Sequence, residues 1–264
     1  MILRDDNDRW IWRETHDENT YGLGYLVGQT VLDIGAHIGS FAMLALEHGA
    51  RRVVCIEPCA ANARLLRENL AFWGQRVEII QKAVVGDNQP VGTTTLWHCP
   101  LKKGNAAAGG SGHSIAWRDS KEVSTETVAT IPFSHVMKPW FDLVKLDCEG
   151  SEYAIIRSPS FKDVRSMVAE FHPITSHAPA DARRWLAELG FIEEKWVEAV
   201  LPCGDKNYWL YKGVQACMKS SSACPAQAWY TTPMSPGSPQ NATRCIEPSP
   251  ATAAPTLIPA GSPG

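Results

Sequence analysis

The chain has 264 residues, of which 44% are hydrophobic, and a formal net charge of -3. This length suits one large domain with an appended segment, and the lack of a long Lys/Arg block disfavours a dedicated nucleic-acid binder. The first residues are charged and no long apolar run occurs, so we expect no signal peptide and no membrane partner.

The first 30 residues form a separate segment before the regular pattern begins. Trp10, Ile11 and Trp12 alternate in a way that predicts a short strand. Residues 20–25 are a candidate cover for a ligand. We therefore interpret residues 1–30 as an N-terminal strand and cap segment.

From Val31 onward, apolar strands alternate with helical segments. Strands are expected at 31–34, 52–56, 77–84, 141–147, 166–171, 192–198 and 207–212, and helices at 39–48, 60–72, 151–157 and 180–189. This alternation predicts an α/β fold with a doubly wound, mostly parallel sheet and helices on both faces. The two final strands predict a hairpin that adds an antiparallel strand.

Two stretches interrupt this alternation. Residues 86–127 are rich in Gly, Ser and Thr, which predicts a hairpin with a flexible loop. Beyond residue 213 the chain is rich in Pro, Ser and Ala and shows no period, so it cannot bury enough apolar area to offset its ordering entropy. The predicted organisation is a cofactor-binding domain over 31–213 and a disordered tail over 214–264.

The stretch VLDIGAHIGSFAMLALEHGA, residues 31–50, joins the first strand to the first helix. Gly35 and Gly39 are spaced G-x-x-x-G, and His37 stands where a dinucleotide turn has the glycine that lets pyrophosphate approach. Asp33 would repel a pyrophosphate but attract an ammonium group. These features favour S-adenosylmethionine, which carries an ammonium and no phosphate, over NAD.

The second strand ends in CIEP, where Glu57 follows the first turn at a distance typical of an acid that binds ribose hydroxyls. This supports adenosine without choosing between the two cofactors. An alternative is that Gly35 and Gly39 only permit tight packing and that Asp33 caps a helix. The candidate cofactor-binding residues are Asp33, Gly35, Ala36, His37, Gly39, Glu57, Pro58, Ala83 and Asp147.

The fourth strand runs into DLVKLDCEGSEYAII, residues 142–156. Asp147 is expected at its carboxyl end, where open parallel sheets bind ligands, and Lys145 shares its side of the strand. With Glu149 and Glu152 close behind, three acids and a lysine meet at one strand end, which is costly unless they bind something. Alternatively, an acid there favours the helix N-terminus.

The fifth strand ends in VAEFHP, which places Glu170 and His172 on one side near the same edge. His172 is a candidate general base for a hydroxyl acceptor, and Asp147 and Glu170 are alternatives. His172 is equally consistent with a simple hydrogen-bonded residue. Asp147, Glu170 and His172 have ligand types that suit a divalent ion, but the sequence does not predict a metal. The candidate catalytic residues are Asp147, His172, Glu170 and Lys145.

Over residues 25–212 the sequence resembles FkbM-type methyltransferases, a class I group that depends on S-adenosylmethionine. The resemblance rests on VLDIGAHIGSFA, VVCIEPCAANARLLRENL, AVVGD and FDLVKLDCEGSEYAII. His37 departs from the Asn that the family usually has. The resemblance implies a Rossmann-like, seven-stranded sheet with an antiparallel last strand. It also implies O-methylation of a small molecule or glycan.

Three other functions stay open at this point. They are an RNA methyltransferase, a non-catalytic interaction protein on the same fold, and an NAD-dependent dehydrogenase. The eight cysteines include no C-x-x-C pair, which indicates reduced thiols in a cytoplasmic protein rather than a zinc site or disulfides. The acceptor and the oligomeric state are not predicted.

Overall fold

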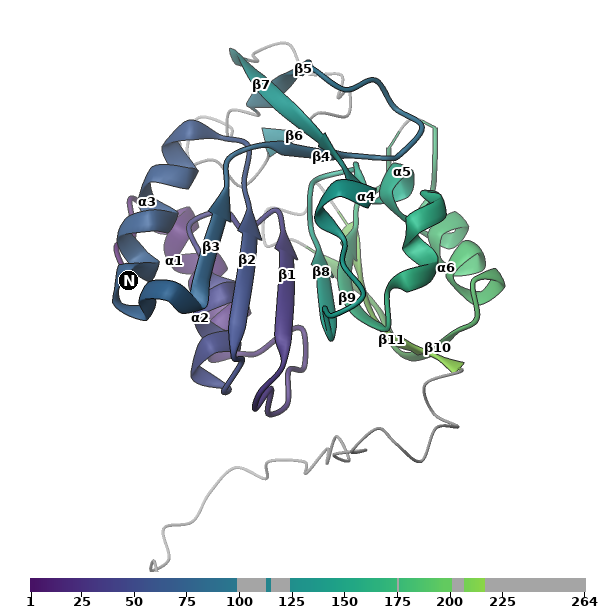
Figure 1. The fold of residues 1–264 in the computed structure, drawn as a ribbon, viewed down its shortest axis with the longest axis horizontal. Coiled ribbons are helices and arrows are strands. Elements are labelled where there is room, and N and C mark those ends of the chain that lie inside the picture. Colours follow the sequence, from purple (N-terminus) through teal and green to yellow (C-terminus); the bar gives the residue numbers. More distant parts are fainter. Residues whose placement is uncertain (99–112, 115–123, 175, 201–206, 217–264) are drawn as a thin grey trace, which may run out of the picture. The chain divides into compact units, whose positions relative to one another are not determined.

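The computed structural model describes residues 1–98, 113–114, 124–174, 176–200 and 207–216. Within them, seven strands form one sheet in the order β10-β11-β9-β8-β1-β2-β3 (Figure 1). The strands are β1 (Thr30–Ile34), β2 (Arg52–Ile56), β3 (Val77–Ile80), β8 (Leu143–Leu146), β9 (Ser166–Phe171), β10 (Phe191–Val200) and β11 (Asn207–Gln215). All neighbours pair in parallel except β11, which is antiparallel to both β9 and β10. The predicted doubly wound fold is confirmed.

Helices cover both faces of this sheet. One face carries α2 (Ser40–Glu47) and α3 (Ala60–Leu70), and the other carries α5 (Glu152–Ile156) and α6 (Pro179–Glu188). Successive side chains of β1 point to opposite faces of the sheet. Val31 therefore packs with the residues of α2 and α3, and Leu32 packs with the residues of α5 and α6. The central strands are apolar because both of their faces are buried.

The expected third strand is divided between two sheets. β3 ends at Ile80, and the chain continues into β4 (Ala83–Val85), which belongs to a second sheet of order β4-β7-β5-β6. Its other strands are β5 (Thr93–His98), β6 (His113–Ser114) and β7 (Ser124–Pro132). β5 and β7 pair in antiparallel fashion, which confirms the predicted hairpin. In Figure 1 this small sheet lies beyond one end of the strands β1–β3.

Short helical segments complete the described part of the chain. They are the 3-10 helices η2 (Ala71–Arg76) and η3 (Pro159–Asp163) and the single-turn helix α4 (Phe133–Val136). η2 follows α3 directly, so helical structure over the predicted 60–72 region continues into a tighter turn. Phe133 of α4 and Phe161 of η3 are fully buried in the core that also holds α5 and α6.

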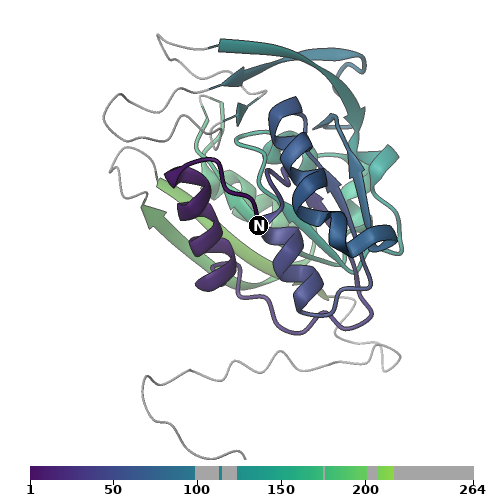
Figure 2. The ribbon, with the colours of Figure 1, turned by 90° about the vertical axis from the view of Figure 1, so that its left-hand side faces the viewer.

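The predicted strand at residues 10–12 is wrong. This region is helical, with α1 (Asp6–Trp12) followed by the π-helix η1 (Arg13–Asp17). The Asp5 side chain accepts a hydrogen bond from the Asp8 N–H and so caps the helix, a stronger local signal than three alternating residues. Figure 2 shows α1 beside α2, on the same face of the sheet.

The C-terminal boundary lies slightly later than expected, because β11 continues to Gln215. The predicted tail from residue 217 lies outside the described residues. Among the helices of the described part of the chain, none is both long enough and apolar enough to cross a membrane.

Candidate active site

A cavity opens at the carboxyl edge of the main sheet, beside the ends of β1, β2, β8 and β9. The chain leaves β1 toward β2 on one side and returns to β8 on the other, so this is the topological switch point where such sheets bind ligands. Predicted site residues that line it are Gly35, His37, Glu57, Pro58, Ala83, Asp147, Glu170 and His172. Four others do not line it: Asp33, Ala36, Gly39 and Lys145.

The two glycines of the first turn have different roles. Gly35 has a φ of +80°, and a Cβ there would lie 1.8 Å from the Asp147 carbonyl oxygen, so the β1 and β8 ends could not approach each other with any other residue. A Cβ on Gly39 would instead lie 2.9 Å from Leu66 Cδ1. Gly39 therefore serves helix packing, whereas Gly35 shapes the edge of the cavity.

Glu57 is the centre of one end of the cavity, which we call the ribose end. Its carboxylate accepts hydrogen bonds from the His37 N–H at 2.9 Å, the Cys59 N–H at 3.0 Å and the Asn62 side chain at 3.3 Å. Burial raises the pKa of Glu57 to about 7, although these three donors oppose the shift. A carboxylate has about four acceptor positions, so a further donor can still bind.

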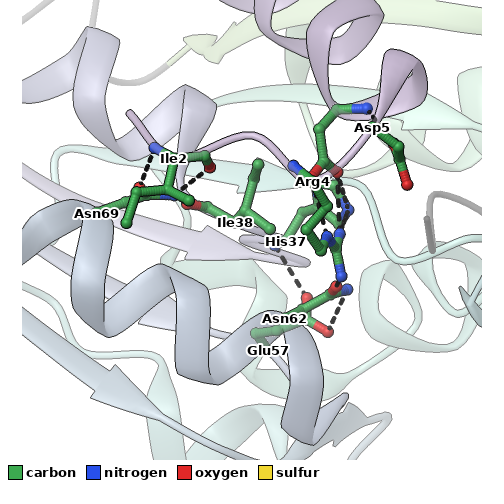
Figure 3. Close-up of polar contacts among 9 residues, drawn as sticks. Ile2, Arg4, Asp5, His37, Ile38, Glu57, Asn62 and Asn69 are labelled. Atoms are coloured by element: carbon green, nitrogen blue, oxygen red, sulfur yellow. Dashed lines mark hydrogen bonds and ion pairs between the residues drawn. The ribbon is translucent and has the colours of Figure 1, made fainter.

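The N-terminal segment covers these donors. The Arg4 guanidinium donates to Asn62 Oδ1 at 2.8 Å and lies 3.1 Å from His37 Nε2, as Figure 3 shows. Its charge is matched by Asp8, a fully buried carboxylate that pairs with Arg4 Nε at 2.9 Å. Farther along, Ile2 is tied to α3 through Asn69. The turn residue His37 thus contributes both its backbone and its side chain.

Asp33 requires a correction. The sequence places it beside a ligand ammonium, but in the structure it is fully buried and its partner is the ammonium of Lys145, 3.3 Å away. Lys145 also lies 3.3 Å from Asp147 Oδ2 and donates to the Gly35 carbonyl at 2.7 Å. Burial lowers the pKa of Lys145, but Asp33 and Asp147 outweigh it and raise that pKa. Lys145 is a charged bridge behind the cavity wall.

The other end of the cavity, which we call the carboxylate end, combines Asp147, Glu170 and two tyrosines. The Tyr21 hydroxyl donates to Glu170 at 2.6 Å and lies 3.3 Å from Asp147. Burial and the charge of Asp147 raise the pKa of Glu170 well above its usual range. Tyr208 similarly donates to Glu14, a carboxyl whose pKa burial raises to about 7.

His172 lies among carboxylates of three different segments of the chain. Its Nε2 is 3.8 Å from Glu149 and 4.0 Å from Glu170, and its Nδ1 is 3.9 Å from Glu152. Burial opposes protonation, but Glu149 and Glu152 prevail and raise the pKa of His172 to about 10. These carboxylates favour the protonated imidazole, which is the form that cannot accept a proton from an acceptor hydroxyl.

Sequence reasoning missed several residues of the site. Glu14, Asn62 and Tyr208 line the cavity, and Arg4 supports it from outside. Glu14 and Arg4 belong to the segment that was predicted to contain a strand, and Tyr208 lies in a closing hairpin strand with no functional motif. Asn62 alone had a signal, because it follows CIEP by one helical turn.

The fold and the site together define a doubly wound α/β protein with a polar cavity at its switch point. The family model "Methyltransferase FkbM domain" matches residues 33–193. The chain belongs to the FkbM methyltransferase family and is a methyltransferase. No curated protein matches the chain in sequence.

Several solved structures are similar in fold. Magnesium protoporphyrin IX methyltransferase from Synechocystis PCC 6803 with bound SAH is 12% identical, with 82% of this chain and 90% of that chain covered and a TM-score of 0.48. TrmK from M. capricolum with S-adenosyl-homocysteine is 10% identical, with coverage of 76% and 68% and a TM-score of 0.44. Precorrin-6y C5,15-methyltransferase from Geobacter metallireducens is 14% identical, with coverage of 77% and 88% and a TM-score of 0.42.

Proposed function

We propose that this methyltransferase uses S-adenosylmethionine to methylate a hydroxyl group of a small molecule or glycan. The observation that carries this proposal is the division of one cavity into two chemically different ends. Glu57 with its ring of donors marks one end, and Asp147, Glu170 and Tyr21 mark the other. The first end fits a nucleoside, and the second fits an acceptor that offers hydroxyl groups.

The ribose end fits S-adenosylmethionine better than a phosphate-bearing cofactor. Glu57 is buried, 4% exposed, and its carboxylate can accept hydrogen bonds from ribose hydroxyls. The nearest guanidinium, Arg4, is already neutralised by Asp8 on two of its nitrogens. A phosphate beside Glu57 would therefore meet a carboxylate and no uncommitted charge from Arg4.

When bound, S-adenosylmethionine supplies the methyl group: its S–CH3 bond breaks as the acceptor C–O bond forms, and sulfur keeps the electron pair. Asp147 and Glu170 orient the acceptor by accepting its O–H hydrogen bond, and a carboxylate takes the released proton. Tyr21 holds both carboxylates in place, and Lys145 fixes Asp147 from behind. The catalytic contribution is mainly that of positioning.

Two measurements test this function. Calorimetric titration with S-adenosylmethionine should show saturable binding, and no binding at millimolar ligand would refute it. Transfer of a radiolabelled methyl group to a panel of polyhydroxylated compounds then tests the acceptor class. Salt-dependent retention of RNA, with methylation of that RNA and none of the polyols, would favour the nucleic-acid alternative instead.

The free cysteines support a reducing compartment for this enzyme. Within the part of the chain that the structure describes, Cys55, Cys59 and Cys148 are all free thiols. Burial raises the pKa of the Cys55 thiol well above its usual range, so it is not a reactive thiolate. We therefore include a cytoplasmic location in the proposal, and fractionation of cells that express the full chain tests it.

A further inference from the structure

The carboxylate end of the cavity contains a second, unexplained arrangement. One potential ligand atom from each of Asp147, Glu152 and His172 lies within 4.8 Å of the other two. Asp147 follows β8, Glu152 begins α5, and His172 follows β9, so separate elements of the fold bring them together. Glu152 is not among the residues that the proposed O-methylation uses.

The imidazole of His172 lacks a hydrogen-bond partner on Nδ1 among the described residues. The residue is 8% exposed, and the Glu152 oxygen that this nitrogen faces is 3.9 Å away. That separation exceeds a hydrogen bond, which is about 2.7–3.2 Å long for nitrogen and oxygen. A buried polar atom without a partner is uncommon and points to a group that occupies the space between.

The two carboxylates of this group are held in position by other contacts. The Glu152 oxygens accept hydrogen bonds from the Cys148 N–H at 2.6 Å and the Gly150 N–H at 2.7 Å, and each keeps a further acceptor position. Asp147 is fixed by Lys145 and Tyr21. Such supporting hydrogen bonds are typical of carboxylates that bind metal ions.

The distances allow one ion between the three side chains. Two ligands that each lie about 2.1 Å from a metal are at most about 4.2 Å apart. The 3.9 Å between His172 and Glu152 falls within this limit, whereas the 4.8 Å span exceeds it by about 0.6 Å, so binding of an ion requires an inward shift of that size. One imidazole with two carboxylates suits Mn²⁺, Fe²⁺ or Zn²⁺.

We propose that Asp147, Glu152 and His172 bind a divalent metal ion at the carboxylate end of the cavity. Asp147 and His172 line the cavity, so the ion faces the space where the acceptor would enter. There it would bind the acceptor hydroxyl and favour loss of its proton, which Glu170 takes as the oxygen bonds to the methyl carbon. This use of the ion rests on the proposed function, whereas binding of the ion does not.

The test is a titration of the full-length, metal-stripped protein with Mn²⁺, followed by electron paramagnetic resonance. We expect one saturable site per chain. His172→Gln and Glu152→Gln should each weaken Mn²⁺ binding at least tenfold. Glu78→Gln is the control: it removes a carboxylate charge from an exposed pair with Arg52, away from the cavity, so its Mn²⁺ affinity should equal that of the unaltered protein.

Three results would overturn the metal site: no saturable Mn²⁺ binding, unchanged affinity in folded His172→Gln and Glu152→Gln, or equal losses in Glu78→Gln. Circular dichroism verifies the fold of each variant, and Asp147→Asn provides a third ligand test if Glu152→Gln does not fold. Titration with S-adenosylhomocysteine in chelator, on the same samples, separates the two proposals. If S-adenosylhomocysteine binds and Mn²⁺ does not, only the metal site is refuted. If Mn²⁺ binds and S-adenosylhomocysteine does not, only the proposed function is refuted.

Discussion

The two ends of the cavity satisfy their polar groups in different ways. At the ribose end, Glu57 has three hydrogen-bond donors, and Arg4 with Asp8 supports two of the residues that provide them. At the carboxylate end, His172 has carboxylate oxygens near both ring nitrogens but at 3.8–4.0 Å. The Glu57 carboxylate thus has hydrogen-bond donors within the protein, whereas no hydrogen-bond partner reaches His172 Nδ1 from the described residues.

This difference indicates which kind of ligand each end can bind. A carboxylate with satisfied donors and a spare acceptor position suits a neutral ligand that donates, such as a ribose hydroxyl. A buried cluster of carboxylates is costly unless a cation joins it. Behind the cavity wall, Lys145 bridges Asp33 on one side and Asp147 on the other.

The largest expected effect comes from removing that bridge. Lys145→Met leaves the fully buried Asp33 without its partner, which should lower the free energy of unfolding by about 3–5 kcal/mol. Urea denaturation followed by circular dichroism measures it. The double variant Asp33→Asn/Lys145→Met should recover much of the loss. If Lys145→Met is as stable as the unaltered protein, the ion pair with Lys145 does not stabilise buried Asp33, and the structural role given to Asp33 is wrong.

The next effect separates the two ends by ligand affinity. Glu57→Ala should weaken S-adenosylhomocysteine binding about hundredfold, because it removes a charged acceptor of two hydrogen bonds worth about 3 kcal/mol together. His172→Ala is the matched truncation at the carboxylate end and should change this affinity less than threefold. Calorimetry compares the two variants. Equal losses of S-adenosylhomocysteine affinity would show that the cofactor does not bind mainly at the ribose end.

The sequence predicted the sheet well because its strands are buried on both faces and therefore continuously apolar. The sequence also predicted that Gly35, Glu57 and Asp147 lie at one edge of the sheet, since the carboxyl ends of parallel strands meet there, and all three line the cavity. It failed for Asp33, because its partner on the neighbouring strand, Lys145, lies more than a hundred positions away in the sequence. Such long-range pairing is not encoded in any local spacing.

A smaller effect tests whether the N-terminal segment belongs to the ribose end. Arg4→Ala removes the contacts to Asn62 and His37, so S-adenosylhomocysteine affinity should fall about tenfold, or about 1.4 kcal/mol. Arg9→Ala is the control, because it removes the same charge from an exposed pair with Asp6 and should leave the affinity unchanged. Added guanidinium ion should restore part of the S-adenosylhomocysteine affinity of Arg4→Ala and should not change that of Arg9→Ala. Indistinguishable affinities in the two variants would exclude the segment from the site.

The smallest effect concerns the charge of the carboxylate end and appears as a pH dependence. The pKa of Glu14 is about 7, because burial and the nearby Asp147 and Glu18 raise it while Tyr208 and His172 oppose them. A raised carboxyl pKa stabilises the fold fully below about pH 4.5, and this contribution is lost as the pH rises through about 7.

Glu14→Gln keeps the acceptor for Tyr208 and removes the titration. The variant should therefore be more stable than the unaltered protein at pH 8, by about 1 kcal/mol after allowance for solvent in the cavity. At about pH 3.5 the two proteins should be equally stable, because Glu14 is then protonated in both the folded and the unfolded chain, whose ordinary Glu pKa is 4.5. Urea denaturation at both pH values measures the difference. An advantage of Glu14→Gln that is the same at both pH values would mean that the carboxylate charge is not its cause, and the contrast between the two ends would then lose its electrostatic basis.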